Sequence, residues 1–135
     1  MADIRTGLAA NLAPIPGLQE SPWLLSNPTP PAAEIQPDEV DYDQALGRGL
    51  DRWRFTVRVF AGFTSDVGAQ KLLDLMLAPS GPRSVKAALE SDCTLGGKVD
   101  DLRVTRCSGY RLYGRDGGPS VLGAEWQVEV LVAGR

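Results

Sequence analysis

The sequence predicts a single α+β domain, 1–135, in which a mainly antiparallel sheet has helices packed on one face and a β-hairpin projects from it. Two segments, 51–61 and 125–132, alternate apolar and polar residues, as half-buried strands do. A segment with helical spacing, 66–77, lies between them without any βαβ repetition, which favours an antiparallel sheet. The length of 135 residues is that of one ordinary domain.

The N-terminal residues predict a helix over 2–12. Ile4, Leu8 and Leu12 recur at four-residue spacing and would form one apolar stripe. Two prolines just beyond this segment end the helix, because proline lacks a donor and excludes the helical region for the residue before it.

A projecting hairpin is expected over 18–36. A short strand over 18–25 leads into the turn Ser-Asn-Pro-Thr-Pro-Pro, and a second extended piece follows over 32–36. The three prolines make the turn stiff and confine an adjacent strand to a sheet edge. The acidic residues that follow, 37–50, have no clear period and predict an ordered loop.

The next strand is expected over 51–61, where the apolar face carries an aromatic and β-branched series and the polar face carries Arg54, Thr56 and Arg58. Its apolar residues are Trp53, Phe55, Val57 and Val59.

Two helices are expected after this strand. Ser65 is a suitable N-cap for a helix over 66–77, and Ser-Gly-Pro ends it. A shorter helix over 84–90 precedes a turn at Thr-Leu-Gly-Gly. The residues expected to face inward from the first helix are Val67, Leu72, Leu73 and Met76.

Two further strands complete the predicted sheet. One begins at Leu102 and runs to about Tyr113, and a turn over 114–119 is rich in residues that tolerate positive φ. The last strand places Trp126 with three valines on one face.

The composition excludes most catalytic chemistry. The chain has no histidine, so it has no Ser-His or Cys-His pair and no imidazole metal ligand. Glu125 and Glu129 share one strand face, but four residues separate them by about 13 Å, too far for a glycosidase pair. Cys93 and Cys107 match no metal knuckle or redox motif and are expected to be reduced thiols. We therefore expect no enzyme activity, no catalytic residue, no cofactor and no metal.

The densest carboxylate cluster is Asp38, Glu39, Asp41 and Asp43. An EF-hand loop needs oxygen ligands at positions 1, 3 and 5 and glycine at 6, and neither the register that starts at Asp38 nor the one that starts at Asp41 supplies them. The cluster is therefore interpreted as a solvated or partner-facing loop.

The tryptophans fall into two groups. Trp53 and Trp126 are in phase with apolar strand faces, which indicates core packing. Trp23 lies beside the proline-rich turn, where packing on its own domain and contact with another protein are both open.

Charge and hydropathy bear on partners and location. The formal net charge is −3, from 14 basic and 17 acidic residues, which disfavours broad binding to nucleic acid. The N-terminus lacks the pattern of a secretion signal, and no apolar run approaches the roughly 20 residues that span a bilayer. The protein is expected to be made in the cytoplasm and to be soluble there, with no membrane partner.

The chain resembles the tail terminator proteins of siphophages, in the form found in phages of actinobacteria. The resemblance spans nearly the whole chain, from the opening helix (IRTGLAANLAPIPGLQ) to the last strand. It is carried by the runs PTPPAAEIQPDEVDYDQALGRGLDRWRFTVRVF, LLDLMLAPSGPRSVKAALESDCTLGGKVDDLRV and VLGAEWQVEVLV.

This resemblance implies a structural virion protein that forms a homo-oligomeric ring, typically of six copies. The ring would cap the head-proximal end of the tail tube, end tube polymerisation, and join the tail to the connector or neck. Its partners would be the tail tube protein and the neck protein, and genomic DNA would pass through the bore without sequence-specific binding.

Tube subunits add through heterologous contacts that continue indefinitely, so a terminator must offer one face that matches the last ring and another that does not. Edge strands and projecting hairpins are suited to such contacts. The expected contact segments are 18–36, 38–47 and 109–119, and the expected contact residues are Trp23, Pro28, Pro30, Asp38, Glu39, Asp41, Asp43, Arg54, Arg58, Tyr110, Arg115 and Asp116.

Three other functions remain open from the residues alone. A head-completion or neck connector protein also forms rings. A small-molecule-binding or enzymatic α+β domain would need a pocket with convergent polar groups, which the sequence does not indicate. An interaction module of the host cell is compatible with the composition.

Overall fold

The computed structural model describes residues 2–15, 18–21, 31–42, 50–63, 67–97, 99–115 and 118–133. In these ranges the elements are, in chain order, α1 (Ala2–Leu12), β1 (Gln19–Ser21), β2 (Ala32–Asp41), β3 (Leu50–Phe63), α2 (Val67–Leu77), α3 (Val85–Leu89), β4 (Asp101–Arg115) and β5 (Gly118–Ala133). The strands form one open sheet in the order β1-β2-β3-β5-β4, and only the β1–β2 pair is parallel. The predicted α+β class, with a mainly antiparallel sheet, is confirmed.

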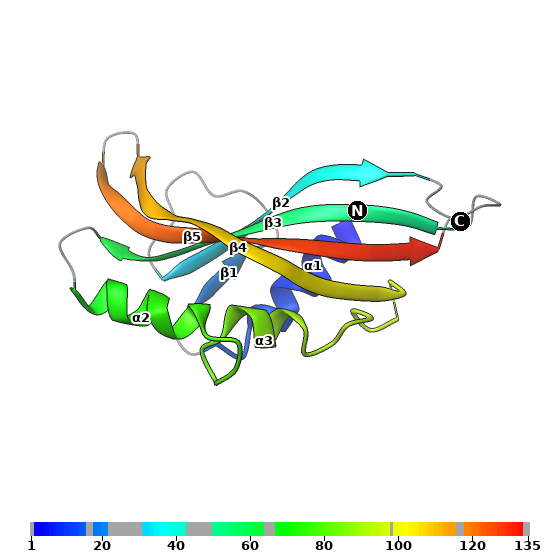
Figure 1. The fold of residues 1–135 in the computed structure, drawn as a ribbon, viewed down its shortest axis with the longest axis horizontal. Helices are drawn as coiled ribbons and strands as arrows, with labels where there is room; N and C mark the ends of the chain where they lie inside the picture. Colours follow the sequence, from blue (N-terminus) through cyan, green and yellow to red (C-terminus); the bar gives the residue numbers. More distant parts are fainter. Residues whose placement is uncertain are drawn as a thin grey trace.

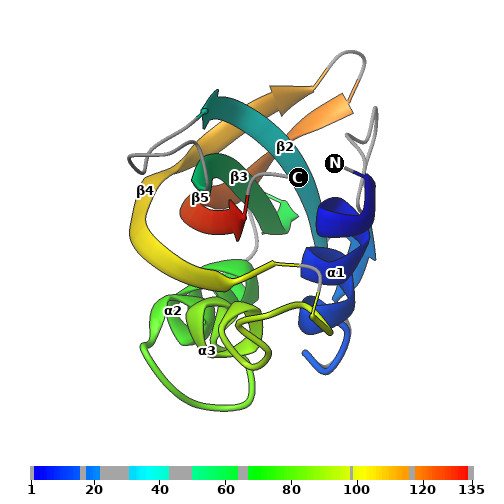
Figure 2. The ribbon, with the colours of Figure 1, turned by 90° about the vertical axis from the view of Figure 1, so that its right-hand side faces the viewer.

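All three helices lie against one face of the sheet (Figures 1 and 2). Their buried side chains join one apolar cluster with the inward residues of β2, β3 and β5. Phe55, Val57 and Val59 are fully buried there, as their alternation predicted. Trp126 is buried in the same cluster, and Trp53 is partly buried and packs against it, stacked on Phe55 with ring centroids 6.3 Å apart. Both tryptophans therefore have the predicted core role.

The first helix, α1, has the predicted bounds and buries Ile4, Leu8 and Leu12. It also contacts α3 through a polar side chain. The Asn11 amide donates hydrogen bonds to the carbonyl oxygens of Leu89, at 2.9 Å, and Asp92, at 3.2 Å. These bonds connect the N-terminal helix to the segment that follows α3.

The predicted hairpin over 18–36 is wrong. Gln19 pairs with Ala32 and Ser21 with Glu34, so β1 and β2 run parallel, whereas hairpin strands must be antiparallel. Proline fixes its own φ but does not determine the relative direction of two strands, so the proline-rich stretch was weak evidence for a hairpin. The predicted strand residues 22–25 and most of the predicted turn lie outside the described residues.

The predicted acidic loop over 37–50 is wrong over 37–41 and at Leu50, which belong to strands, and residues 43–49 lie outside the described residues. β2 continues through the acidic residues to Asp41 and pairs with β3 along its length, with a register shift between Pro37 and Glu39. The proline and the shift interrupt the two-residue alternation, so these residues show no strand period.

The second helix, α2, confirms the predicted segment from Val67 onward. Leu73 and Met76 are buried as expected, and Leu72 is partly buried. Val67 is 62% exposed, so its predicted inward position is wrong. Nine residues separate it from Met76, which at 3.6 residues per turn places the two side chains roughly 180° apart around the helix. The proposed cap Ser65 lies outside the described residues.

The short helix α3 begins at a buried cap. The Ser84 hydroxyl accepts a hydrogen bond from the Ala87 amide at 3.1 Å and donates one to the Ala78 carbonyl oxygen. One side chain thus satisfies the start of α3 and fixes the connection from α2.

The predicted turn after α3 is confirmed and is held by Asp92. Its carboxylate accepts hydrogen bonds from the Thr94 hydroxyl and from the amides of Thr94 and Gly96. These bonds lower the pKa of Asp92, and the Thr94 hydroxyl contributes most. Leu95 and the two glycines that follow have positive φ, a conformation that glycine adopts without steric cost.

The last two strands are longer than predicted. β4 continues to Arg115 and β5 begins at Gly118, so the predicted turn over 114–119 is wrong at 114, 115, 118 and 119, and residues 116 and 117 lie outside the described residues. Glycine and proline at the start of a long strand do not prevent pairing, because proline is tolerated in the first residues of a strand. Among the described residues, no helix is long and apolar enough to cross a membrane.

Candidate interaction surface on the outer face of the sheet

The face of the sheet turned away from the helices is polar, and we call it the outer face. Residues that alternate with the buried ones on four long strands supply it. Its polar members are Glu34, Asp38, Glu39, Asp41, Arg52, Arg54, Thr56, Arg58, Arg103, Thr105, Glu125, Gln127 and Glu129.

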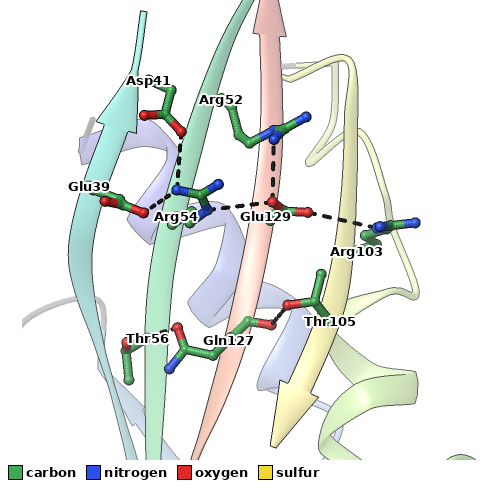
Figure 3. A network of polar contacts seen from close by, with 9 residues as sticks. All are labelled: Glu39, Asp41, Arg52, Arg54, Thr56, Arg103, Thr105, Gln127 and Glu129. Carbon is green, nitrogen blue, oxygen red and sulfur yellow. Dashed lines mark hydrogen bonds and ion pairs between the residues drawn. The ribbon is translucent and has the colours of Figure 1, made fainter. Parts of the chain in front are cut away.

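Arg54 lies at the centre of one network on this face (Figure 3). Its guanidinium pairs with Glu39 and with Asp41 Oδ2, 3.1 Å away, both on β2. On the other side its Nε lies 3.5 Å from Glu129 Oε1 on β5. The hydrogen bond to Glu39, more than any other cause, raises the pKa of Arg54. The arginine thus connects three neighbouring strands, β2, β3 and β5.

Glu129 extends this network to the far edge of the sheet. Its carboxylate lies 3.8 Å from Arg52 Nε on β3 and 3.9 Å from Arg103 Nε on β4 (Figure 3). Opposite charges on adjacent strands stabilise a sheet by a few tenths of a kcal/mol to about 1 kcal/mol per pair. Ion pairs therefore link four strands of the sheet in an unbroken row.

A row of neutral and acidic groups lies beside the ion pairs. The Thr56 hydroxyl donates to the Asp38 carboxylate and lies 3.5 Å from Gln127 Oε1. On β4, the Thr105 hydroxyl donates to the Gln127 carbonyl oxygen at 3.3 Å. Asp38 is thus exposed but held to the sheet by its bond to Thr56.

Arg58 pairs with Glu34, the most buried charged side chain of the described outer face. It lies 3.3 Å from Glu34 Oε1 on β2 and 2.8 Å from Glu125 Oε2 on β5. Glu34 is only 4% exposed, so its carboxylate depends on nearby cations and donors. Burial acts to lower the pKa of Arg58, but the hydrogen bond and charge of Glu125 and the charge of Glu34 outweigh it, and the pKa is raised.

Next to Arg58, the outer face becomes apolar. The rings of Phe60 and Tyr113 meet edge to face with centroids 5.7 Å apart, and the guanidinium groups of Arg58 and Arg111 lie over the Tyr113 ring. Gly123 makes this possible, because a Cβ there would lie 2.5 Å from the Val59 carbonyl oxygen and 3.1 Å from the Phe60 ring.

The sheet has two open edges in the described part of the chain. β1 pairs only with the first three residues of β2, so the acidic half of β2 has no further strand beside it. β4 is the opposite edge, and its Arg103, Arg106, Tyr110, Arg111 and Leu112 are exposed. Tyr110 also reaches α2, where its hydroxyl lies 3.4 Å from Asp74 Oδ1.

The structure distributes the predicted contact residues over several places. Asp38, Glu39 and Asp41 lie on β2, and Arg54 and Arg58 lie beside them on β3, all within the ion-paired outer face. Tyr110 and the backbone of Arg115 lie on the opposite edge strand, β4. The remaining predicted contact residues lie outside the described residues, and they are Trp23, Pro28, Pro30, Asp43 and Asp116.

Sequence reasoning missed several members of this surface. Glu34, Arg103 and Arg106 were not expected there. Glu125 and Glu129 were placed on the polar face of the last strand but were not included among the contact residues. The alternation of Glu125, Gln127 and Glu129 with buried residues was a usable signal for the β5 members. The partners on β2 could not be found this way, because cross-strand pairing depends on register.

The arrangement favours structural roles over chemistry. The carboxylates of the described outer face contact arginines or a threonine, and the described residues contain no group of three or more potential metal ligands. Two shallow depressions flank β5, one lined by Arg52, Arg103 and Glu129 and the other by Arg54, Arg106 and Glu129. Cys93 and Cys107 are both free thiols, and only Cys107 is exposed, on β4.

Comparison with known proteins adds no assignment. No protein-family model matches the chain, and no curated protein matches it.

Proposed function

We propose that the chain is a structural subunit of a long-tailed phage virion. It forms a ring, of six copies as the resemblance implies, at the head-proximal end of the tail tube. The ring ends polymerisation of the tube and joins the tail to the neck connector. It performs no catalysis.

The observation that carries this proposal is the distribution of charged side chains on the described surface. At the centre of the outer face, Arg54 pairs with Glu129, and Arg58 pairs with Glu34 and Glu125. These ion pairs join neighbouring strands of the sheet. Well-exposed charged side chains of the described residues lie along the edge strands, among them Glu39 on β2 and Arg103 and Arg106 on β4. A protein with such a surface is suited to contacts with other proteins.

The fold provides what a terminator requires. Tube subunits contact each other heterologously, so growth stops only when the last ring presents a face that does not accept another subunit. A sheet with two different open edges and one helical face offers separate surfaces for neighbours within the ring and for partners above and below it. The net charge of −3 suits a bore through which DNA passes without being retained.

Labelling of intact virions tests the proposal. Gold-conjugated antibodies raised against the full chain are applied to purified particles and to tails separated from heads, and are viewed by electron microscopy. The proposal predicts label at the head-proximal tail end in both preparations. Label along the tube, at the distal tip, or only on heads would contradict it.

A further inference from the structure

Formal charge alternates in sign from strand to strand across the sheet. β2 carries two aspartates and two glutamates with no basic residue, and β3 carries three arginines against one aspartate. β5 carries two glutamates and no basic residue, and β4 carries four arginines against one aspartate. Along the four long strands, in the order β2-β3-β5-β4, neighbouring strands therefore carry opposite signs, whereas the short β1, with Glu20, has the same sign as β2. Such cross-strand charge pairs are stabilising, and like charges placed opposite each other are destabilising.

This series ends with opposite signs at the two open edges. The acidic edge is the part of β2 beyond its pairing with β1, from Ile35 to Asp41, and the basic edge is β4. Glu39 has 57% of its side chain exposed, and Arg103 has 72% exposed. Arg106 is exposed and makes no ion pair with any residue that the structure describes. Both edges thus have charge available for a partner.

Charges on edge strands also serve to prevent aggregation, and this alternative role predicts a different distribution of charge. Protection works best when both edges carry the same sign, because identical copies then repel each other in every edge-to-edge orientation. Opposite signs at the two edges do the reverse, since they attract the β4 edge of one copy to the β2 edge of the next. Pro37 has no amide hydrogen, so pairing at this edge relies on side-chain charge more than on an unbroken backbone ladder.

We propose that a second copy of this chain occupies each edge, with the basic β4 edge of one copy against the acidic β2 edge of its neighbour. The contact is heterologous, so it generates a ring when the rotation closes. It continues the alternation of charge from one subunit into the next. The proposal deepens the function proposed above by naming the surfaces that join ring subunits, and in that sense it rests on that function.

Charge reversal tests this contact with the purified full chain. Arg106→Glu lowers the formal charge of β4 from +3 to +1 and reverses the charge at position 106, and Glu39→Arg changes β2 from −4 to −2 and reverses the charge at position 39. Each variant alone is expected to associate at least about 10-fold more weakly than the unchanged chain, by sedimentation velocity and native mass spectrometry at low salt. An equimolar mixture of the two variants is expected to recover assembly, because each interface then joins opposite charges, and the recovered oligomers contain even numbers of subunits.

Lys71→Glu is the matched control, since it changes the net charge by the same amount as Arg106→Glu at an exposed position on α2. It is expected to assemble normally. Circular dichroism and thermal unfolding show whether each variant folds. Glu39→Gln and Arg106→Gln replace any variant that does not, and they test the weakened association alone, because two neutral side chains cannot restore it in a mixture. High salt should weaken assembly of the unchanged chain, because it screens exposed charges.

Three results overturn the contact: an unchanged chain that stays monomeric, single variants that assemble normally, or a mixture that does not recover. If gold marks the tail end but the single variants still assemble, the edge contact is wrong and the proposed function stands. If the variants behave as expected but virions carry no label, the chain associates through these edges and the proposed function is wrong.

Discussion

Replacement of Arg58 by methionine tests whether the outer-face ion pairs stabilise the fold. Methionine keeps most of the length of the side chain and removes its charge and donors. The arginine side chain is 29% exposed and contacts Glu125 at 2.8 Å and Glu34 at 3.3 Å. We expect Arg58→Met to lose the cation that compensates Glu34, whose side chain is only 5% exposed.

The expected magnitude follows from that burial. Removing one partner of a buried ion pair costs about 3–5 kcal/mol, and a hydrogen bond to a charged group is worth about 1.5–3 kcal/mol. Because Arg58 and Glu125 are partly exposed, water recovers some of the loss, and we expect about 3 kcal/mol. In a domain of this size that lowers the melting temperature by about 10 °C.

Urea unfolding followed by tryptophan fluorescence measures this loss, with Arg103→Met as the matched control. Arg103 lies on the same face but is 72% exposed, so its loss is expected to stay below about 1 kcal/mol. Adding Glu34→Gln to Arg58→Met removes the buried charge that Arg58 no longer contacts and should recover part of the stability. A loss below about 1 kcal/mol for Arg58→Met, or no recovery in the double variant, would refute the reasoning.

Three further predictions concern the core, a close backbone approach and pH. Leu73→Ala removes a fully buried side chain and should cost about 2–5 kcal/mol in urea unfolding, whereas Leu75→Ala, on the exposed side of the same helix, should change stability by less than about 0.5 kcal/mol. Gly123→Ala places a Cβ 2.5 Å from the Val59 carbonyl oxygen and should cost about 1–3 kcal/mol, so an unchanged melting temperature would contradict the contact. The pKa of Asp92 is lowered in the folded state. Its contribution to the stability of the fold is therefore complete above the ordinary pKa of a carboxyl group, about 4, and is lost as pH falls through the pKa in the folded state. Asp92→Asn should therefore reduce the pH dependence of stability below about pH 4, and an unchanged slope would count against this turn contact.

The central strands and helices could be predicted because the spacing of their apolar residues along the sequence matches the pattern of buried positions. Phe55, Val57 and Val59 alternate with polar residues on a strand that has helices on one side only, so the two-residue period is complete. Leu8 and Leu12 likewise repeat at helical spacing. The prediction that Val67 faces inward was wrong because apolar character alone does not determine the position of a residue around a helix. Its angular separation from Met76 was the better indicator.

The acidic half of β2 and the direction of β1 could not be predicted from local patterns. β2 continues as a strand through its pairing with β3 and through Arg54, which lies 15 residues from Glu39 in the sequence. Glu34 is tolerated in the interior because Arg58 lies 24 residues away in the chain and beside it in the sheet. Such partners become visible only when register is known, and register depends on the path of the whole chain.

The length of the tail tube tests the central claim most directly. Tubes are measured by electron microscopy in lysates of a phage whose gene for this chain is interrupted, and again after the full chain is supplied from a plasmid. We predict a broad length distribution with tubes unattached to heads, and a return to one length on complementation. Tubes of a single normal length, joined to heads without this chain, would contradict the account.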